Sequence, residues 1–487
     1  AVELPHDWAV DAPFCPEIEG GASQGYRDRW GIGWYRKRFQ AAKKPGVQYA
    51  LYFDGIYENS TIWVNGRKAG GRKYGYSSFR IDITPFLEAG ENEIRIRVDN
   101  SVRPSDRWYS GAGIYRKVWW QERPYGGLQD EKIDIQTVIE EGRALIRVGY
   151  DEEIPLRVKL ADQESPISPG GYVLVEVKNP RLWSAEDPYL YDLVIERWND
   201  REKIDSVHQK IGLRQIEWRP QEGLWINGKH TLLRGVCLHQ HVACCGIAVK
   251  KELWRDRLQK LKKLGCNALR LAHHPFSREF LDLCDEMGFY VYEECFDKWM
   301  SGAYGRYFGT EWKRDLDAMV LRDRNRPSII MWGVGNEVEN QGQVSMLDHL
   351  KDLVYAVKDL DGTRPVTYAM NPHFKRESGI DASKVKDIQK FVDEEDDLEI
   401  YDPAEMIWTG YDYLGEAMQY PSKGWSGSLL RSNGVPRGTY YQIQSYWTDK
   451  PMVHFAVLDY SMGTECVKEH WDSPPYLTHW DFPQYLR

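Results

Sequence analysis

The sequence lacks the features that mark membrane-bound and nucleic-acid-binding proteins. No apolar run approaches the length that a transmembrane helix needs. Residues 1–8 show no basic segment followed by an apolar one, so no secretory signal peptide is visible. The formal net charge of −9 at pH 7 disfavours nucleic acid and anionic membranes. We therefore expect neither nucleic acid nor a membrane as a partner.

Cysteines in paired spacing are also missing. The chain has eight cysteines but no C-x-x-C motif. Cys244 and Cys245 are adjacent, and neighbours cannot easily bridge each other. Because disulfides belong to oxidising compartments, this pattern predicts reduced thiols and a cytoplasmic location.

What the sequence does contain indicates a large globular protein. A hydrophobic fraction of 42% and an aromatic fraction of 13% exclude disorder. At 487 residues the chain is too long for one core, so we expect two to four domains. The 20 tryptophans are unusually many. Indoles stack on pyranose faces, although most tryptophans in any protein belong to the core.

Two β-rich segments come first. Residues 1–120 contain alternating runs at 51–54, 61–64 and 93–99, and the pair Asn65-Gly66 predicts a tight hairpin. Short strands between turns predict a β-sandwich. Residues 121–216 stay β-rich, with a period of two at 172–177, and have the size of a second sandwich. We interpret that second segment as a structural spacer without chemistry.

From residue 217 onward, strands and helices alternate. Strands are expected at 232–237, 268–271, 289–293, 329–335 and 365–370. A helix containing Leu258 and Leu261 should end at Gly265, and Ser277 should cap the next helix. Further helices are expected around Leu316 and from Ser345 to near residue 362. This alternation predicts a parallel sheet of the β/α-barrel type.

The stretch 329–339 is the most informative part of the chain. Its apolar strand ends in Asn336 and Glu337, at the strand end where α/β folds keep their chemistry. With the preceding RDRNRPS at 322–328, it resembles the family-2 glycoside hydrolases, the β-galactosidase and β-glucuronidase group. Residues 4–8 and 107–116 resemble signatures of that family's sugar-binding jelly roll, and 179–191 the end of its immunoglobulin-like domain.

The resemblance implies a three-domain glycosidase. Its parts would be a sugar-binding-like jelly roll at 1–120, an immunoglobulin-like sandwich at 121–216, and a catalytic (β/α)8 barrel with a C-terminal extension at 217–487. The substrate would be a small or oligosaccharide glycoside, and we expect a homo-oligomer. The family retains anomeric configuration, which needs two carboxyl groups about 5 Å apart.

Site residues carry over from the family by position. Glu337 would be the general acid/base, its pKa raised by a second carboxylate nearby. Asn336 would bind the sugar 2-hydroxyl. The other expected contacts with substrate are His239 and His273 at the first two strand ends, Trp408 as the pocket floor, and Asp412 and Glu416 at the rim.

The strand count does not complete a barrel. Residues 405–410 resemble the family's last strand and bring the total to six. The stretch 371–404 is too short and polar for two more βα units. The family's nucleophile, a Glu at the end of the seventh strand, has no match here. We expect a chain break near 402–405, where residues are missing from the sequence. Otherwise the barrel is shortened and inactive, and Glu416 is a weak candidate nucleophile.

Cofactor and sugar preference follow from two departures from the family. Some members hold Mg²⁺ through a Glu-x-His after the third strand, but this chain has Asp297-Lys298-Trp299 there, so we expect no metal and no cofactor. The Asn-x-Lys motif of the β-glucuronidases is missing near the C-terminus.

A β-galactoside is accordingly the first choice of substrate. A uronide, glucuronide or galacturonide, is the alternative, with Lys423 or Arg431 pairing its carboxylate. A non-catalytic carbohydrate-binding protein on a degenerate barrel is a third possibility.

Overall fold

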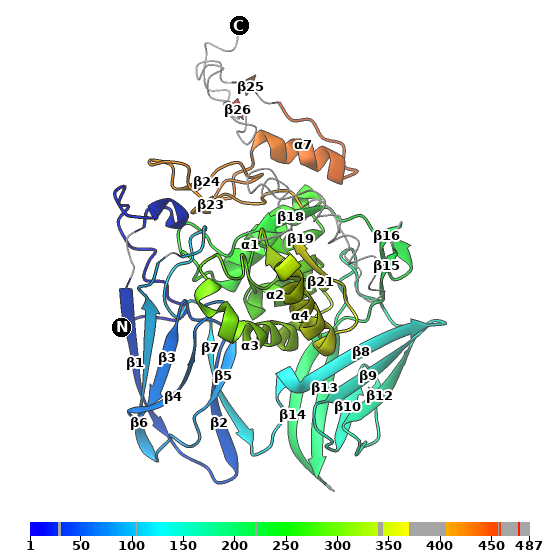
Figure 1. The fold of residues 1–487 in the computed structure, drawn as a ribbon. Helices are drawn as coiled ribbons and strands as arrows, with labels where there is room; N and C mark the ends of the chain where they lie inside the picture. Colours follow the sequence, from blue (N-terminus) through cyan, green and yellow to red (C-terminus); the bar gives the residue numbers. More distant parts are fainter. Residues whose placement is uncertain are drawn as a thin grey trace.

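Two β-sandwiches lie beneath a helix-rich unit in the computed structural model (Figure 1). The structure describes residues 1–27, 31–103, 105–199, 201–219, 222–338, 344–369, 406–455, 457–458 and 476–477. The first sandwich lies at the left of the view and the second at the right, and the parallel sheet with its helices lies above and between them.

The first sandwich is built from seven strands. One sheet has the order β1 (Gly31–Ala41), β6 (Gly90–Asn100), β3 (Ser60–Val64), β4 (Arg67–Arg72), and the other β5 (Phe79–Asp82), β2 (Val47–Phe53), β7 (Val118–Pro124). The predicted hairpin joins β3 to β4: Asn65 and Gly66 have φ of 50° and 77°, which a two-residue hairpin loop requires. A short 3-10 helix, Gly21–Gln24, precedes β1.

The second sandwich repeats this two-sheet plan. Its sheets are β11 (Gln163–Glu164), β10 (Leu156–Leu160), β13 (Tyr191–Asn199), β14 (Glu202–Ile211), and β12 (Tyr172–Lys178), β9 (Arg143–Tyr150), β8 (Ile133–Glu140). A 3-10 helix, Asp130–Lys132, leads into β8. In β10 every second residue is buried, as the period-two pattern of a half-buried strand requires.

The third unit contains a parallel sheet. After the small sheet β15 (Ile216–Arg219), β16 (Gly223–Ile226), β17 (Lys229–His230), five parallel strands follow in the order β18 (Gly235–Leu238), β19 (Ala268–Leu271), β20 (Tyr290–Glu294), β21 (Ile329–Asn336), β22 (Val366–Ala369). The connecting helices are α1 (Lys251–Leu264), α2 (Arg278–Met287), α3 (Gly305–Asp323) and α4 (Val344–Leu360). The predicted alternation of strands and helices is confirmed.

Residues 406–410 lie beside β18 and take the place of a barrel's last strand. Ile407 N donates to Gly235 O at 3.0 Å, and Cys237 N donates to Ile407 O at 2.9 Å, in a parallel bridge. Among the residues that the structure places, no strand pairs with the outer edge of β22. Within the described residues, the sheet therefore has an unpaired edge at β22. The predicted chain break near 402–405 lies outside the described residues.

The stretch 322–328 before β21 contacts all three units. Arg322 pairs with Asp54 of the first sandwich at 3.3 Å. Asn325 donates to Ile133 O of the second sandwich at 2.9 Å. These side chains are fixed by contacts in all three units, so the strand that carries Asn336 is anchored at its start.

The C-terminal part covers the barrel. β23 (Tyr413–Leu414) pairs with β24 (Gly424–Trp425), and β25 (Val457–Leu458) with β26 (Tyr476–Leu477). Helix α7 (Gly438–Trp447) packs on α1, where Tyr440 donates to Lys260 O at 3.1 Å. No helix in the described ranges combines the length and apolar character that crossing a bilayer requires. Within the described residues, the fold is thus a jelly-roll sandwich, an immunoglobulin-like sandwich and an incomplete β/α barrel, as predicted.

Candidate active site

The carboxyl ends of the parallel strands bring predicted site residues together. His239 follows β18, His273 follows β19, and Asn336 ends β21 with Glu337 directly after it. Trp408, beside β18, stacks on His273 with ring centroids 5.5 Å apart and planes at 9°. Because parallel strands end at one edge of the sheet, these side chains surround one space.

Glu337 lies between two cations. Its Oε2 is 3.1 Å from Lys298 Nζ and 3.5 Å from Arg107 Nη1. Lys298 also donates to the backbone carbonyl of Glu337 at 2.9 Å. The residue has a φ of 48°, a left-handed conformation that non-glycine residues rarely adopt outside functional sites and turns. About a quarter of the side chain, 26%, stays exposed, so a ligand can reach it.

Asn336 is buried and its amide is held at both ends. Nδ2 donates to Asp297 Oδ1 at 2.7 Å, and Oδ1 accepts from Arg270 Nη2 at 2.8 Å. These contacts fix which end of the amide is nitrogen. One N–H of the amide remains available to a ligand beyond the Asp297 bond.

His273 is oriented by a buried carboxylate. Its Nδ1 is 2.8 Å from Glu294 Oε2, and Arg270 pairs with the other oxygen of Glu294. Although burial opposes its charged form, Arg270 and His273 hold the pKa of Glu294 below its usual range. An ionised Glu294 accepts a hydrogen bond from a protonated Nδ1. Nε2 of His273 then remains available to a ligand in the site.

His239 is enclosed by aromatic rings. The ring centroids of Tyr413, Trp108 and Trp408 lie 4.2, 5.1 and 5.3 Å from that of His239. Burial, with the nearby histidines and Arg107, lowers the pKa of His239 well below its usual value, so the ring is neutral. Within the described part of the chain neither ring nitrogen has a hydrogen-bond partner. A buried imidazole in that state suits a polar ligand group.

Arg107 connects the first sandwich to the barrel. Besides Glu337, it pairs with Asp297 at 3.1 Å and with Glu416 Oε1 at 2.7 Å. Despite burial, these carboxylates raise the pKa of Arg107 above its usual range. The Tyr413 hydroxyl donates to the other oxygen of Glu416. Glu416 therefore shares Arg107 with Glu337, and both of its carboxylate oxygens are engaged.

Three predicted residues lie apart from this cluster. Asp412 pairs with Arg437 and accepts from Ser428 N at 3.2 Å. Lys423 Nζ stands over the Phe14 ring, 4.5 Å from its centroid. Arg431 is exposed. No described contact joins Asp412, Lys423 or Arg431 to Glu337, so the geometry gives them no place at the reacting bond.

Sequence reasoning missed Arg107, Asp297 and Lys298 as site residues. Asp297 and Lys298 follow β20. Their position just after a predicted strand could have indicated that they lie at the site. Arg107 begins the aromatic signature at 107–116, but its contacts with the barrel span 190 and 309 residues of sequence. No local pattern reveals contacts of that range.

The metal site of some family members does not fit this chain. Trp299 stands where their Glu-x-His motif has its histidine, and the indole is fully buried, with Nε1 donating to Val334 O at 2.7 Å. An indole cannot replace an imidazole as a ligand. Within the described ranges, no group of three or more His, Cys, Asp or Glu side chains is placed to hold a metal ion.

Comparisons with known proteins agree with this architecture. Models of the glycosyl hydrolases family 2 match residues 22–124 (sugar binding domain), 129–214 and 219–400 (TIM barrel domain). A crystal structure of a glycosyl hydrolase family 2 member from Bacteroides cellulosilyticus is similar over 99% of this chain and 72% of that one, with 30% identity and a TM-score of 0.84.

Two curated relatives are named for different sugars, one as a β-galactosidase and one as a β-glucuronidase. β-Galactosidase BoGH2A from Bacteroides ovatus is 32% identical over 93% of this chain and 69% of its own length. A β-glucuronidase from Bacteroides fragilis is 27% identical over 76% of this chain, which spans only 58% of that protein. The first alignment extends over 592 positions, more than the 487 residues of this chain, so that relative has residues without a counterpart here. By these matches and by its three-domain architecture, the chain belongs to glycosyl hydrolase family 2.

Proposed function

We propose that the chain forms the core of a retaining exo-β-glycosidase that hydrolyses terminal β-galactosides by double displacement. The observation that carries this proposal is Glu337 at the end of β21, contacted by Lys298 and Arg107 and preceded by the buried, fixed amide of Asn336. A carboxyl group at a strand end, reachable from solvent and firmly oriented, suits proton transfer.

In the proposed reaction Glu337 acts twice. It first donates its proton to the glycosidic oxygen while a second carboxylate attacks the anomeric carbon and forms a glycosyl-enzyme. It then takes a proton from water, which attacks the glycosyl-enzyme and releases the sugar. Lys298 and Arg107 stabilise the carboxylate that Glu337 becomes after the first transfer. Asn336 and the histidines His239 and His273 would hold sugar hydroxyls.

We propose that the nucleophile lies on residues missing from this sequence, between β22 and 406–410. The edge of β22, which has no partner strand among the described residues, and the longer alignment with BoGH2A support this proposal. Glu416 is the alternative, since it shares Arg107 with Glu337. Its two oxygens are held by Arg107 and Tyr413, however, so attack by Glu416 would require those bonds to be released.

A neutral galactoside is preferred over a uronide. The two cations expected to pair a uronate, Lys423 and Arg431, do not contact the cluster around Glu337 among the described residues. A uronide remains the second candidate because Arg107 reaches the site with 37% of its side chain exposed, and guanidinium pairs well with carboxylate.

Release of nitrophenol from aryl β-galactoside, β-glucuronide and β-galacturonide tests these proposals. The protein should be expressed from its natural coding sequence. We expect the highest kcat/KM on the galactoside, unchanged by EDTA because no step uses a metal. A higher value on either uronide would overturn the sugar assignment. Binding of galactose without turnover of any of the three would favour the carbohydrate-binding alternative instead.

A further inference from the structure

One face of the jelly roll carries two tryptophans in contact with solvent. In the sheet β1–β6–β3–β4 the side chains of Ile94 and Ile96 face the core, so alternate residues face outward. Trp34 of β1 is 60% exposed, and its ring stacks on that of Trp63 of β3, with centroids 5.4 Å apart and planes at 29°. In Figure 1 this sheet lies at the left, on the side of the first sandwich away from the second. The two rings form one aromatic surface on this outer face.

Cations stand beside the rings on the same face. Residues that are direct partners in adjacent strands leave the same side of a sheet. The register joins four such partners into one row across the sheet, namely Arg36 of β1, Arg95 of β6, Trp63 of β3 and Lys68 of β4. Trp34 lies two residues before Arg36 on β1 and therefore on the same face.

This row has more cations than carboxylates. Glu93 of β6 pairs with both Arg95 and Arg38, so two guanidinium groups share one carboxylate. Within the described residues, no carboxylate pairs with Arg36 or Lys68. Arg36 lies directly opposite Arg95, and like charges in such positions repel each other. The row is therefore positive, although the chain has a net charge of −9.

The charges disfavour a second copy of the chain as the partner of this face. The buried centre of a protein interface is depleted of charged residues. Here the two rings are bordered by the cationic row and by Arg97, which pairs with Asp99 at 2.7 Å. A sugar ring suits such a mixed surface better, because it has an apolar C–H face and polar groups around its rim.

We propose that this outer face binds an acidic oligosaccharide, with pyranose rings against Trp34 and Trp63 and uronate carboxylates on Arg36 and Arg95. Indoles stack on pyranose faces. A guanidinium binds a carboxylate through two parallel hydrogen bonds, and the ligand supplies the negative charge that the row lacks. The face shares no residue with the cluster around Glu337, so the site is independent of the proposed glycosidase activity.

The tryptophan pair has a second explanation, which the test must separate. Aromatic pairs across strands stabilise a sheet by themselves. That role explains the contact between Trp34 and Trp63. It does not explain why a row of partly unpaired cations lies beside the two rings.

Calorimetric titration of the whole chain with hexagalacturonate tests the proposal. This hexamer carries a uronate on every ring, and its α-1,4 bonds are not cleaved by a β-glycosidase. The fully methyl-esterified hexamer is the uncharged counterpart with the same pyranose rings. At low salt we expect the acid to bind about tenfold more tightly than the ester, because it makes hydrogen bonds to charged groups. This difference should shrink as added salt screens the charges.

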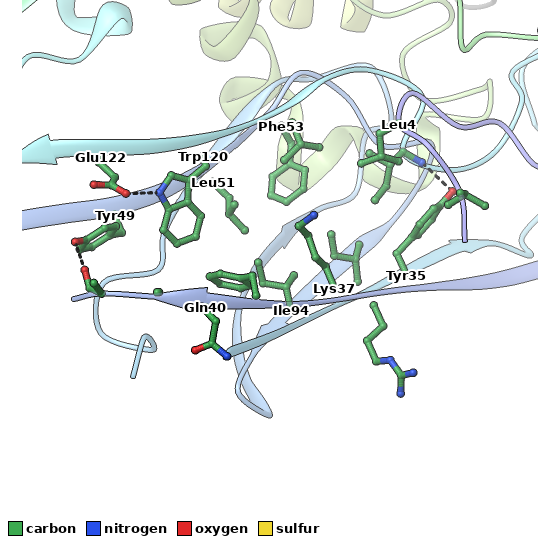
Figure 2. Close-up of a pocket in the computed structure, with 18 of the residues that line it drawn as sticks. Leu4, Tyr35, Lys37, Gln40, Tyr49, Leu51, Phe53, Ile94, Trp120 and Glu122 are labelled. Atoms are coloured by element: carbon green, nitrogen blue, oxygen red, sulfur yellow. Dashed lines mark hydrogen bonds between the residues drawn. The ribbon is translucent and has the colours of Figure 1, made fainter. Parts of the chain in front are cut away.

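Two variants separate the charges from the rings. Arg36→Gln should weaken binding of the acid about tenfold and change binding of the ester less than about twofold. Lys37→Gln is its matched control and should change neither. Lys37 is the next residue of β1, is also exposed, and lies on the other side of the strand, directed toward Phe53 (Figure 2).

Trp34→Ala should weaken both ligands about fivefold or more, because both stack on the ring. Its control is Tyr172→Ala, which removes an exposed aromatic ring beside Arg147 of the second sandwich and should change neither affinity.

Three outcomes would overturn the proposal. One is the absence of heat with hexagalacturonate at low salt on the unmodified protein. Another is an unchanged affinity for the acid in both Arg36→Gln and Trp34→Ala. The third is a dimer of the unmodified protein in analytical ultracentrifugation that becomes a monomer in Trp34→Ala, since the face would then be an interface between two copies. Arg36→Gln changes only an exposed side chain, so it decides the matter even if Trp34→Ala lowers Tm.

Discussion

Whether Glu337 carries a proton depends on the charges around it. Lys298 and Arg107 both favour its ionised form. A general acid must carry a proton before the first step, and a second carboxylate nearby favours that proton by repulsion. Asp297 and Glu416, the other carboxylates of this cluster, share Arg107 with Glu337. A nucleophile carboxylate close to Glu337 would add the repulsion that keeps a proton on it.

Glu337→Gln should remove proton donation and leave the shape of the site intact. We expect substrates with poor leaving groups to lose roughly 10²-fold or more in kcat/KM, and activated aryl glycosides far less, because their leaving groups depart without a proton. Azide should partly restore turnover by attacking the glycosyl-enzyme. An equal loss on both kinds of substrate would assign the acid role to another residue.

Arg431→Ala separates the two sugar assignments. If the substrate is a galactoside, we expect kcat/KM to change by less than about threefold, a loss below 1 kcal/mol, because Arg431 is exposed and outside the cluster around Glu337. Loss of a carboxylate partner would instead cost about 2–5 kcal/mol on a uronide. The measurement is kcat/KM on the galactoside and on the uronide, for the protein and for the Arg431→Ala variant. A large loss restricted to the uronide would place Arg431 at the sugar.

At the scale of elements, much of the fold was predictable because its signals are local. Gly265 adopts a φ of 93° and ends α1 by donating its N–H to the carbonyls of Leu261 and Lys262. β21 could be predicted from its apolar run because both faces of this strand are buried. The contact partner of Asp412 could not be predicted. Asp412 pairs with Arg437 only because the chain between them folds back on itself. Pairings that depend on tertiary folding leave no periodic trace.

The cap of α2 offers a test of an individual element. Ser277 Oγ accepts from Phe280 N at 3.3 Å and satisfies a donor that the first turn leaves open. Ser277→Ala should destabilise the barrel by about 1 kcal/mol, whereas Ser277→Asp, which keeps an acceptor, should cost much less. Denaturant unfolding followed by hydrogen exchange in α2 measures both. Equal losses in the two variants would show that packing at this position matters more than the cap.

At the scale of the whole molecule, the contact between jelly roll and barrel should depend on pH. Glu58 pairs with Arg306 of α3 at 3.1 Å, yet burial outweighs this cation and raises the pKa of Glu58 to about 8. The folded state then binds a proton between about pH 4.5 and 8 that the unfolded state has lost. The stabilisation from Glu58 is therefore fully present below about pH 4.5 and is lost as the pH rises through 8.

Glu58→Gln should flatten that dependence. The slope of unfolding free energy against pH between 5 and 8 should become less negative by up to about 1.4 kcal/mol per pH unit, the value for one proton. Glu88→Gln, on an exposed loop of the same domain, is the control and should leave the slope unchanged. Parallel pH profiles for the protein and the Glu58→Gln variant would mean that Glu58 stays ionised beside Arg306.

Among the described residues, the edge of β22 in the barrel sheet has no partner strand. Unpaired edges of parallel strands promote aggregation, and a β/α barrel covers them by closing. Two strands between β22 and 406–410 would close this one and would place a seventh strand end near Glu337. We therefore expect the natural protein to contain additional residues near 402–405 and to have a mass above the 56.9 kDa of this sequence.

Peptide mapping tests this expectation. A continuous chain gives one tryptic peptide over 391–423, since no Lys or Arg interrupts it before Lys423. We expect that peptide to be absent. New peptides should replace it, and one of them should contain the Glu of the seventh strand. Detection of the intact 391–423 peptide with a matching mass would show a truly shortened barrel. Glu416 would then be the remaining candidate nucleophile, and the inactive alternative would be favoured.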